Sequence, residues 1–146
     1  VHIVPLTLHV GYGTFSPVET EEITKHLIHR EYVELPGASA DIINQVKQRK
    51  GTVWAVGTTS VRTLEFCATR GGEVSAYSGW CDLYIYPGYR FKVVDNLITN
   101  FHLPQSSLMF LVSALCGRDN LLECYRTAIK NGYRFYSYGD AMAVIS

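Results

Sequence analysis

The sequence shows neither a membrane-spanning segment nor a signal peptide. Its longest apolar stretch, residues 107–116, is far shorter than the roughly 18 residues that span a bilayer and instead predicts a buried helix. The start at Val1 has neither a basic segment nor a cleavage pattern, so we expect no signal peptide. Because the chain also lacks an initiator methionine and begins in apolar residues, we expect a fragment of a longer protein.

An excess of either charge is also absent. Thirteen Lys and Arg residues balance thirteen Asp and Glu residues, which excludes nucleic-acid binding by bulk charge alone but leaves room for a local basic patch. The four cysteines form no C-x-x-C motif and no closely spaced set, so we expect no metal site. Scattered thiols among apolar neighbours are typical of a reducing compartment.

What the sequence does contain is the composition of a globular core. Its 146 residues are 47% hydrophobic and 18% charged, which fits one domain or a piece of one. Predicted strands and helices interleave, which indicates an α/β fold with a mixed or parallel sheet flanked by helices. We expect strands at residues 6–10, 30–35, 52–56 (fully buried), 83–86, 91–94 and 133–138, and helices at 40–50, 61–70, 106–116 and 120–130.

A glycine-containing segment follows the first predicted strand. His9, Gly11 and Gly13 lie where the backbone could approach a ligand closely. A dinucleotide-binding motif is not present, because Ser16 replaces its last glycine and no helix clearly follows. The alternative interpretation is a turn that ends the strand.

A cluster of hydroxyl groups lies between a predicted strand and a predicted helix. Thr58, Thr59 and Ser60 follow Gly57, and the free N–H groups of such a helix start favour a phosphate or carboxylate. The alternative is capping of the helix by Thr59 or Ser60.

Two aromatic segments, residues 84–104 and 133–142, hold the remaining candidates. Asp95 and His102 are plausible proton-transfer groups if they share a cleft, and Asp140 could supply a further carboxylate. The alternative makes both aspartates turn residues and His102 a hydrogen-bonded structural group.

Four segments together identify a resemblance. LTLHVGYGTFSPV, AVGTTSVRTLE, YPGYRFKVVDNLITNFHLPQSSLMFLVSA and YRFYSYGDAM closely resemble the S-adenosylmethionine:tRNA ribosyltransferase-isomerase family of the queuosine pathway. The likeness runs from about residue 6 to the end, with Ser107 and Cys81 standing where the family is expected to have threonine.

The resemblance implies that residues 1–146 are the C-terminal portion of the family's α/β domain. That domain is interrupted by a small β-barrel domain, and we expect the barrel and the N-terminal part to be absent here. The implied reaction moves the ribosyl group of S-adenosylmethionine onto preQ1-modified tRNA and isomerises it to epoxyqueuosine. No metal and no cofactor beyond S-adenosylmethionine as co-substrate is expected, nor any contact with a membrane; we expect a cytoplasmic monomer.

The family's chemistry needs a base near the sulfonium, a proton donor for the departing adenine and a deprotonated preQ1 amine. We expect Asp95, His102 and Asp140 to be catalytic, with Asp95 and His102 as the main proton-transfer pair. The expected substrate-binding residues are His9, Gly11, Gly13, Thr58, Thr59, Ser60, Arg62, Tyr86, Tyr89, Lys92, Asn100, Phe101 and Tyr138. Two alternatives remain: an inactive fragment that keeps only nucleoside or tRNA binding, and an α/β domain of unrelated activity.

Overall fold

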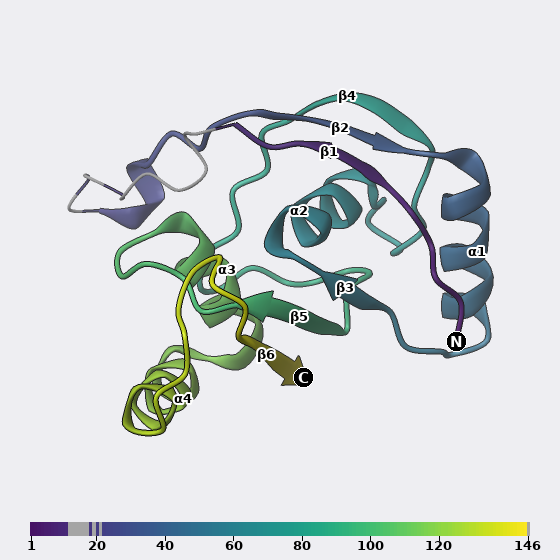
Figure 1. The fold of residues 1–146 in the computed structure, drawn as a ribbon. Helices are drawn as coiled ribbons and strands as arrows, with labels where there is room; N and C mark the ends of the chain where they lie inside the picture. The colour runs from purple at the N-terminus through teal and green to yellow at the C-terminus, as the bar shows by residue number, and fades with distance from the viewer. Residues whose placement is uncertain (12–17, 19, 21, 146) are drawn as a thin grey trace.

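A computed structural model describes residues 1–11, 18, 20 and 22–145, and Figure 1 shows their arrangement. The helices in these residues are one short 3-10 helix, η2, and four α helices. In chain order the elements are β1 (Thr7–His9), η2 (Ile23–Lys25), β2 (Glu31–Leu35), α1 (Gly37–Gln48), β3 (Trp54–Val56), α2 (Thr58–Cys67), β4 (Tyr77–Cys81), β5 (Asn96–Asn100), α3 (Ser107–Cys116), α4 (Arg118–Lys130) and β6 (Ala141–Ile145). None of these helices combines the length and apolar character needed to cross a membrane.

The strands form two separate sheets with α2 between them. The first sheet is antiparallel, in the order β1-β2-β4, and pairs Val33 with Leu8 on one side and Gly79 on the other. The second sheet is mixed, in the order β3-β5-β6, with β3 parallel and β6 antiparallel to β5. Figure 1 shows α2 lying between the sheets, where it contacts strands of both.

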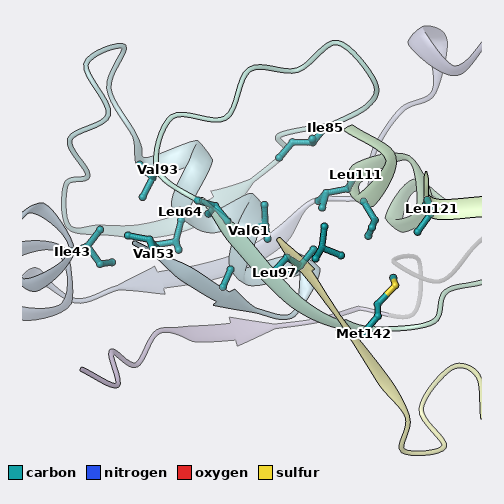
Figure 2. Packing of buried hydrophobic residues seen from close by; sticks show 14 of the residues in the cluster. Ile43, Val53, Val61, Leu64, Ile85, Val93, Leu97, Leu111, Leu121 and Met142 are labelled. Atoms are coloured by element: carbon teal, nitrogen blue, oxygen red, sulfur yellow. The ribbon is translucent and has the colours of Figure 1, made fainter. Parts of the chain in front are cut away.

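The core fills the space around α2. Figure 2 shows Val61 of α2 beside Leu97 of β5, and both side chains are completely buried. Leu111 of α3 and Met142 of β6 belong to the same cluster. Leu97 reaches this core because alternate residues of a strand point to opposite faces of its sheet.

The expected helices are confirmed, with shifts of a few residues at their ends. The Ser106 side chain caps α3 by accepting a hydrogen bond from the Met109 N–H at 3.3 Å, as a serine before an apolar helix predicts. The fold class is confirmed as mixed α/β. Both sheets are open at their edges in the part of the chain that is described.

Three expected strands are wrong, because side chains bind the backbone groups that a strand would need. Residues 91–94 are irregular: the main-chain N–H groups of Lys92, Val93 and Val94 donate to the Glu65 carboxylate. In residues 83–86, the Leu83 carbonyl accepts from Arg62. Residues 133–138 form no strand either, and Tyr136 there adopts a left-handed backbone with φ of 63°.

Three observed strands, β4, β5 and β6, were not predicted from the sequence, and two of them, β4 and β5, carry mixed polar and small residues. β4 contains Ser78 and Gly79, and β5 begins and ends with asparagine, so neither has the apolar alternation used for prediction. The expectation that residues 52–56 are fully buried is also wrong. Trp54 is 44% exposed and Val56 is 68% exposed, because one face of the mixed sheet has no cover in the described residues.

Candidate active site

The candidate site lies at one edge of the mixed sheet. β3 and β5 are parallel, so their carboxyl ends meet at the same edge, where α/β proteins commonly bind ligands. The two strand ends are joined by a hydrogen bond from the Gly57 N–H to the Ile98 carbonyl at 2.8 Å. A cavity of about 360 Å³ opens beyond the end of β5, lined by Asn100, Phe101, His102, Leu103, Ser106, Leu108, Tyr136, Ser137 and Tyr138.

His102 lies on this cavity wall, and its side chain is largely buried, with the residue 9% exposed. Its Nε2 lies 2.9 Å from the Thr99 hydroxyl oxygen, while its main-chain N–H donates to the Tyr125 hydroxyl at 2.6 Å. Burial lowers the pKa of His102 to about 4, because the surrounding groups do not replace the water that a charged ring needs. The ring is therefore neutral at pH 7 in this chain.

Asp140 holds the rim of the cavity together. Its carboxylate accepts hydrogen bonds from the Arg134 main-chain N–H at 2.5 Å and from the guanidinium at 3.2 Å. These bonds hold the pKa of Asp140 below its usual value. The Asn100 side chain donates to the Asp140 carbonyl at 3.0 Å, so the end of β5 is tied to the start of β6.

The aromatic residues at the cavity divide into a buried group and an exposed group. Phe101 is 2% exposed and stacks on Phe135 with ring centroids 4.9 Å apart, so its ring supports the wall rather than offering a free face. Tyr136 and Tyr138 are 43% and 73% exposed and line the cavity from the opposite segment. The Tyr136 N–H donates to the Phe101 carbonyl at 2.9 Å and so joins the two segments.

Asp95 and His102 lie at opposite ends of β5, so the structure of this chain does not bring the two residues of the expected pair together. Asp95 precedes β5 and His102 follows it, so at ~3.3 Å per residue the strand itself separates them by about 13 Å. The Asp95 carboxylate binds the Lys47 ammonium at 2.9 Å and the Val53 N–H at 2.7 Å. It therefore fastens α1 to the start of the mixed sheet, and it lines a second, polar cavity with Lys47.

Arg62 is a structural residue in this chain. Its side chain is 4% exposed and forms an ion pair with Glu31, whose side chain is 1% exposed. The guanidinium also donates to the Leu83 and His29 carbonyls, both at 3.0 Å. An arginine with these partners is not available to a tRNA backbone, so the expectation that Arg62 binds substrate is not supported.

The expected binding residues Tyr89 and Lys92 also contact protein groups. The Tyr89 hydroxyl donates to Glu65 at 3.1 Å, and burial, with the nearby carboxylate, raises the pKa of Tyr89. The Lys92 ammonium lies 3.4 Å from the Glu65 carbonyl oxygen. Tyr86 is half-buried with its ring 5.1 Å from that of Tyr84. None of these three expected binding residues lines the cavity beside His102.

The hydroxyl segment at the start of α2 reaches the same sheet edge but is buried. The capping alternative is wrong: Gly57 is the N-cap, with φ of 88°, and no side chain caps the helix. The Ser60 hydroxyl instead donates to the Val56 carbonyl at 2.7 Å. No side chain caps the start of α2, so it remains a candidate anion site.

The described residues include only part of the first glycine segment. His9 is exposed in β1 with its ring edge against Tyr32, and Gly11 is exposed with open space around it. Gly13 lies outside the described residues. The described part of this segment does not line the cavity.

Sequence reasoning missed the residues that hold His102. Thr99 and Tyr125 bond to its ring and backbone, and Tyr125 lies in an otherwise ordinary helix that gave no signal. Ser106, which caps α3, also lines the cavity. Tyr136 and Ser137 fall inside an aromatic segment that the sequence did single out.

The site offers a neutral imidazole, an amide and exposed aromatic faces beside an apolar wall. Such a cavity suits a partly apolar organic ligand with ring systems or a soft positive charge. Within the described residues, no group of three or more His, Cys, Asp or Glu side chains could hold a metal ion. The fold and cavity define an α/β protein whose candidate ligand site lies at the carboxyl end of a parallel strand pair.

Comparison with known proteins identifies the family to which the chain belongs. A family described as "Queuosine biosynthesis protein" matches residues 1–144. The chain is 63% identical to the S-adenosylmethionine:tRNA ribosyltransferase-isomerase of Desulfotalea psychrophila over 97% of its length, and 54% identical to that of Moorella thermoacetica over 99%. The chain therefore belongs to the queuosine biosynthesis protein family that includes these transferase-isomerases.

A solved structure agrees with this assignment. The chain resembles the crystal structure of S-adenosylmethionine tRNA ribosyltransferase from Thermotoga maritima with a TM-score of 0.73 and 46% identity over 79% of this chain. The match covers 41% of that structure, and the chain spans 40% and 42% of the two sequence relatives. This chain thus corresponds to a portion of those enzymes.

Proposed function

We propose that this chain is the C-terminal part of the α/β domain of an S-adenosylmethionine:tRNA ribosyltransferase-isomerase. The enzyme would transfer the ribosyl group of S-adenosylmethionine to preQ1-modified tRNA and isomerise it to epoxyqueuosine. The observation that carries the proposal is the 63% identity to the Desulfotalea psychrophila enzyme across nearly the whole chain. The cavity supports it, because two of the segments that carry the resemblance meet there.

The exposed aromatic residues of the cavity suit a sulfonium substrate. Tyr136 and Tyr138 present ring faces to which a positively charged sulfur is attracted. Asn100 supplies a polar group on the same wall, although its amide N–H already binds the Asp140 carbonyl. We assign Asp140 a positioning role, because its carboxylate holds Arg134 and its segment shapes the rim.

His102 is the proton-transfer group of the proposal. With a pKa of about 4 it is neutral at pH 7, so it cannot store a proton in this chain alone. A nearby anion would raise that pKa, and the methionine carboxylate of S-adenosylmethionine is the anion that the proposed substrate brings. Thr99 would then hold the ring in place through its bond to Nε2.

The proposal does not assign a catalytic role to the other expected site residues. Asp95 and Arg62 hold the fold, as their partners indicate. The start of α2 remains a candidate for the methionine carboxylate or a tRNA phosphate. The proposal includes cytoplasmic location and no cofactor beyond S-adenosylmethionine.

One observation favours a second candidate for the isolated chain. The chain spans about two fifths of its relatives, so it would contribute one wall of the site and bind nucleoside or tRNA without turnover. The first candidate describes this chain as part of a complete enzyme, and the second describes the chain by itself.

The experiment uses a chimera in which this chain replaces the matched part of the Desulfotalea psychrophila enzyme. Release of adenine from S-adenosylmethionine is measured with preQ1-modified tRNA, for the chimera and for this chain alone. The proposal predicts adenine release and an epoxyqueuosine product from the chimera and none from the chain alone. A folded chimera that releases no adenine, while the parent enzyme does, would overturn it.

A further inference from the structure

The outer face of the mixed sheet is apolar and uncovered in the described residues. Trp54, Val56, Ile98 and Ile145 are 44%, 68%, 38% and 69% exposed, and Ala143 is also exposed. Alternation along the strands places these five side chains on the face opposite to Leu97 and the core. We call these five residues the outer face.

The strand register makes these residues neighbours. Val56 lies beside Ile98, and Ile98 lies beside Ala143, so a continuous apolar row crosses all three strands. Trp54 and Ile145 flank Asn96 in the next row. An apolar patch that spans a whole sheet is typical of an interaction surface rather than of scattered exposed residues.

In the described residues, the helices that pack on the mixed sheet leave its outer face uncovered. α2 and α3 both pack on the inner face, against β3, β5 and β6. Sheets with parallel strands normally have helices on both faces, and β3 is moreover an edge strand with one free side in the described residues. An apolar helix could therefore pack on the outer face, and a further strand could pair with the free edge of β3.

Charge excludes nucleic acid as the occupant. The outward positions of the three strands are Trp54, Val56, Asn96, Ile98, Asn100, Ala141, Ala143 and Ile145, and none is charged. A tRNA backbone needs lysine or arginine contacts, so it would bind elsewhere. An apolar protein surface fits this face.

We propose that the outer face is the docking surface for the polypeptide that makes up the rest of the enzyme in this family, which lays an apolar helix across Val56 and Ile98. The Desulfotalea psychrophila relative has about three fifths of its length without a counterpart here, which is ample to supply this cover. Asn100 lies on the same side of β5 as Ile98 and also lines the cavity, so the docked polypeptide would border the candidate site.

Accessibility of residue 56 tests the proposal without any measurement of activity. Val56→Cys is placed in this chain and in the chimera, and labelling by iodoacetamide at that position is followed by peptide mass spectrometry. We expect labelling at least tenfold slower in the folded chimera than in the same chimera unfolded in guanidinium, and little protection in the isolated chain. Equal labelling rates in the folded and unfolded chimera would overturn the proposal.

A charged substitution provides the second measurement. Val56→Lys should lower the thermal midpoint of the chimera, while the matched control Ile129→Lys, at a residue 66% exposed on α4, should change it little. Equal changes in the thermal midpoint for the two substitutions would argue against the outer face as a covered docking surface. Protection of residue 56 in the isolated chain that vanishes on dilution would instead identify a second copy as the occupant, and would also overturn the proposal.

Discussion

Arg62→Leu is the substitution that most clearly separates a structural role from a substrate-binding role. The change removes an ion pair with Glu31 in which the two side chains are 4% and 1% exposed. It also removes hydrogen bonds to the carbonyl groups of Leu83 and His29. Glu31 would remain buried without its guanidinium partner, and this makes the change costly.

The expected loss follows from the burial of the pair. Breaking a buried ion pair from one side lowers the free energy of unfolding by about 3–5 kcal/mol. For a chain of 146 residues this corresponds to a fall in the thermal midpoint of about 6–20 °C, at ~2–4 °C per kcal/mol. The double change Glu31→Leu with Arg62→Leu should recover much of the loss, because two apolar side chains replace a pair that was expensive to desolvate.

Urea unfolding followed by circular dichroism measures these differences. Arg118→Leu is the control, because Arg118 and Asp119 form a pair 3.4 Å apart with 76% and 93% exposed side chains, and its loss should stay within about 0.5 kcal/mol. A loss for Arg62→Leu below about 1 kcal/mol, as for an exposed pair, would refute the structural role. Arg62 would then again be a candidate for binding substrate.

Three further predictions concern buried ionisable groups. Burial lowers the pKa of His102 from 6.5 to about 4, so between these pH values the unfolded chain binds a proton that the folded chain does not. The free energy of unfolding should therefore fall by up to roughly 3 kcal/mol as the pH drops from 7 to 4. Urea unfolding across this range should show the loss in the parent and not in His102→Gln, and an equal dependence of stability on pH in both would contradict the prediction. The two carboxylate oxygens of Glu65 accept hydrogen bonds from three main-chain N–H groups and from the Tyr89 hydroxyl. Glu65→Gln replaces one of these oxygens with an amide, and should lower the free energy of unfolding by about 2 kcal/mol in the same assay. An unchanged urea midpoint would show that the carboxylate does not hold residues 92–94. Burial raises the pKa of Cys67 to about 11, and Cys81 is buried, so iodoacetamide at pH 8 should label the exposed Cys124 first; equal labelling of all three would be incompatible with the described core.

Local patterns predicted the helices well and the strands poorly. The helices have apolar periodicity and clear ends, such as Ser106 before α3. The strands were missed where tertiary contacts decide: residues 91–94 look like a strand, but the Glu65 carboxylate binds their N–H groups. Asn96 and Asn100 look like loop residues, yet they pair with β6 in the middle of the mixed sheet.

The candidate site was predictable in its segments but not in its pairings. The segments around His102 and Tyr138 do meet at one cavity, and both carry the family resemblance. Spacing along the chain could not show that Asp95 and His102 lie at opposite ends of β5. Nor could it show that Tyr125 would contact His102, because 23 residues and a helix–helix connection separate them.

The central claim is that the cavity beside His102, and not the polar cavity beside Asp95, belongs to the active site. The most direct test compares His102→Gln and Asp95→Asn in the chimera, by adenine release with saturating S-adenosylmethionine at a temperature where both variants are folded. The account predicts a fall in kcat of at least about 100-fold for His102→Gln and a rate near the parent value for Asp95→Asn. A normal rate for His102→Gln together with a large loss for Asp95→Asn would contradict it.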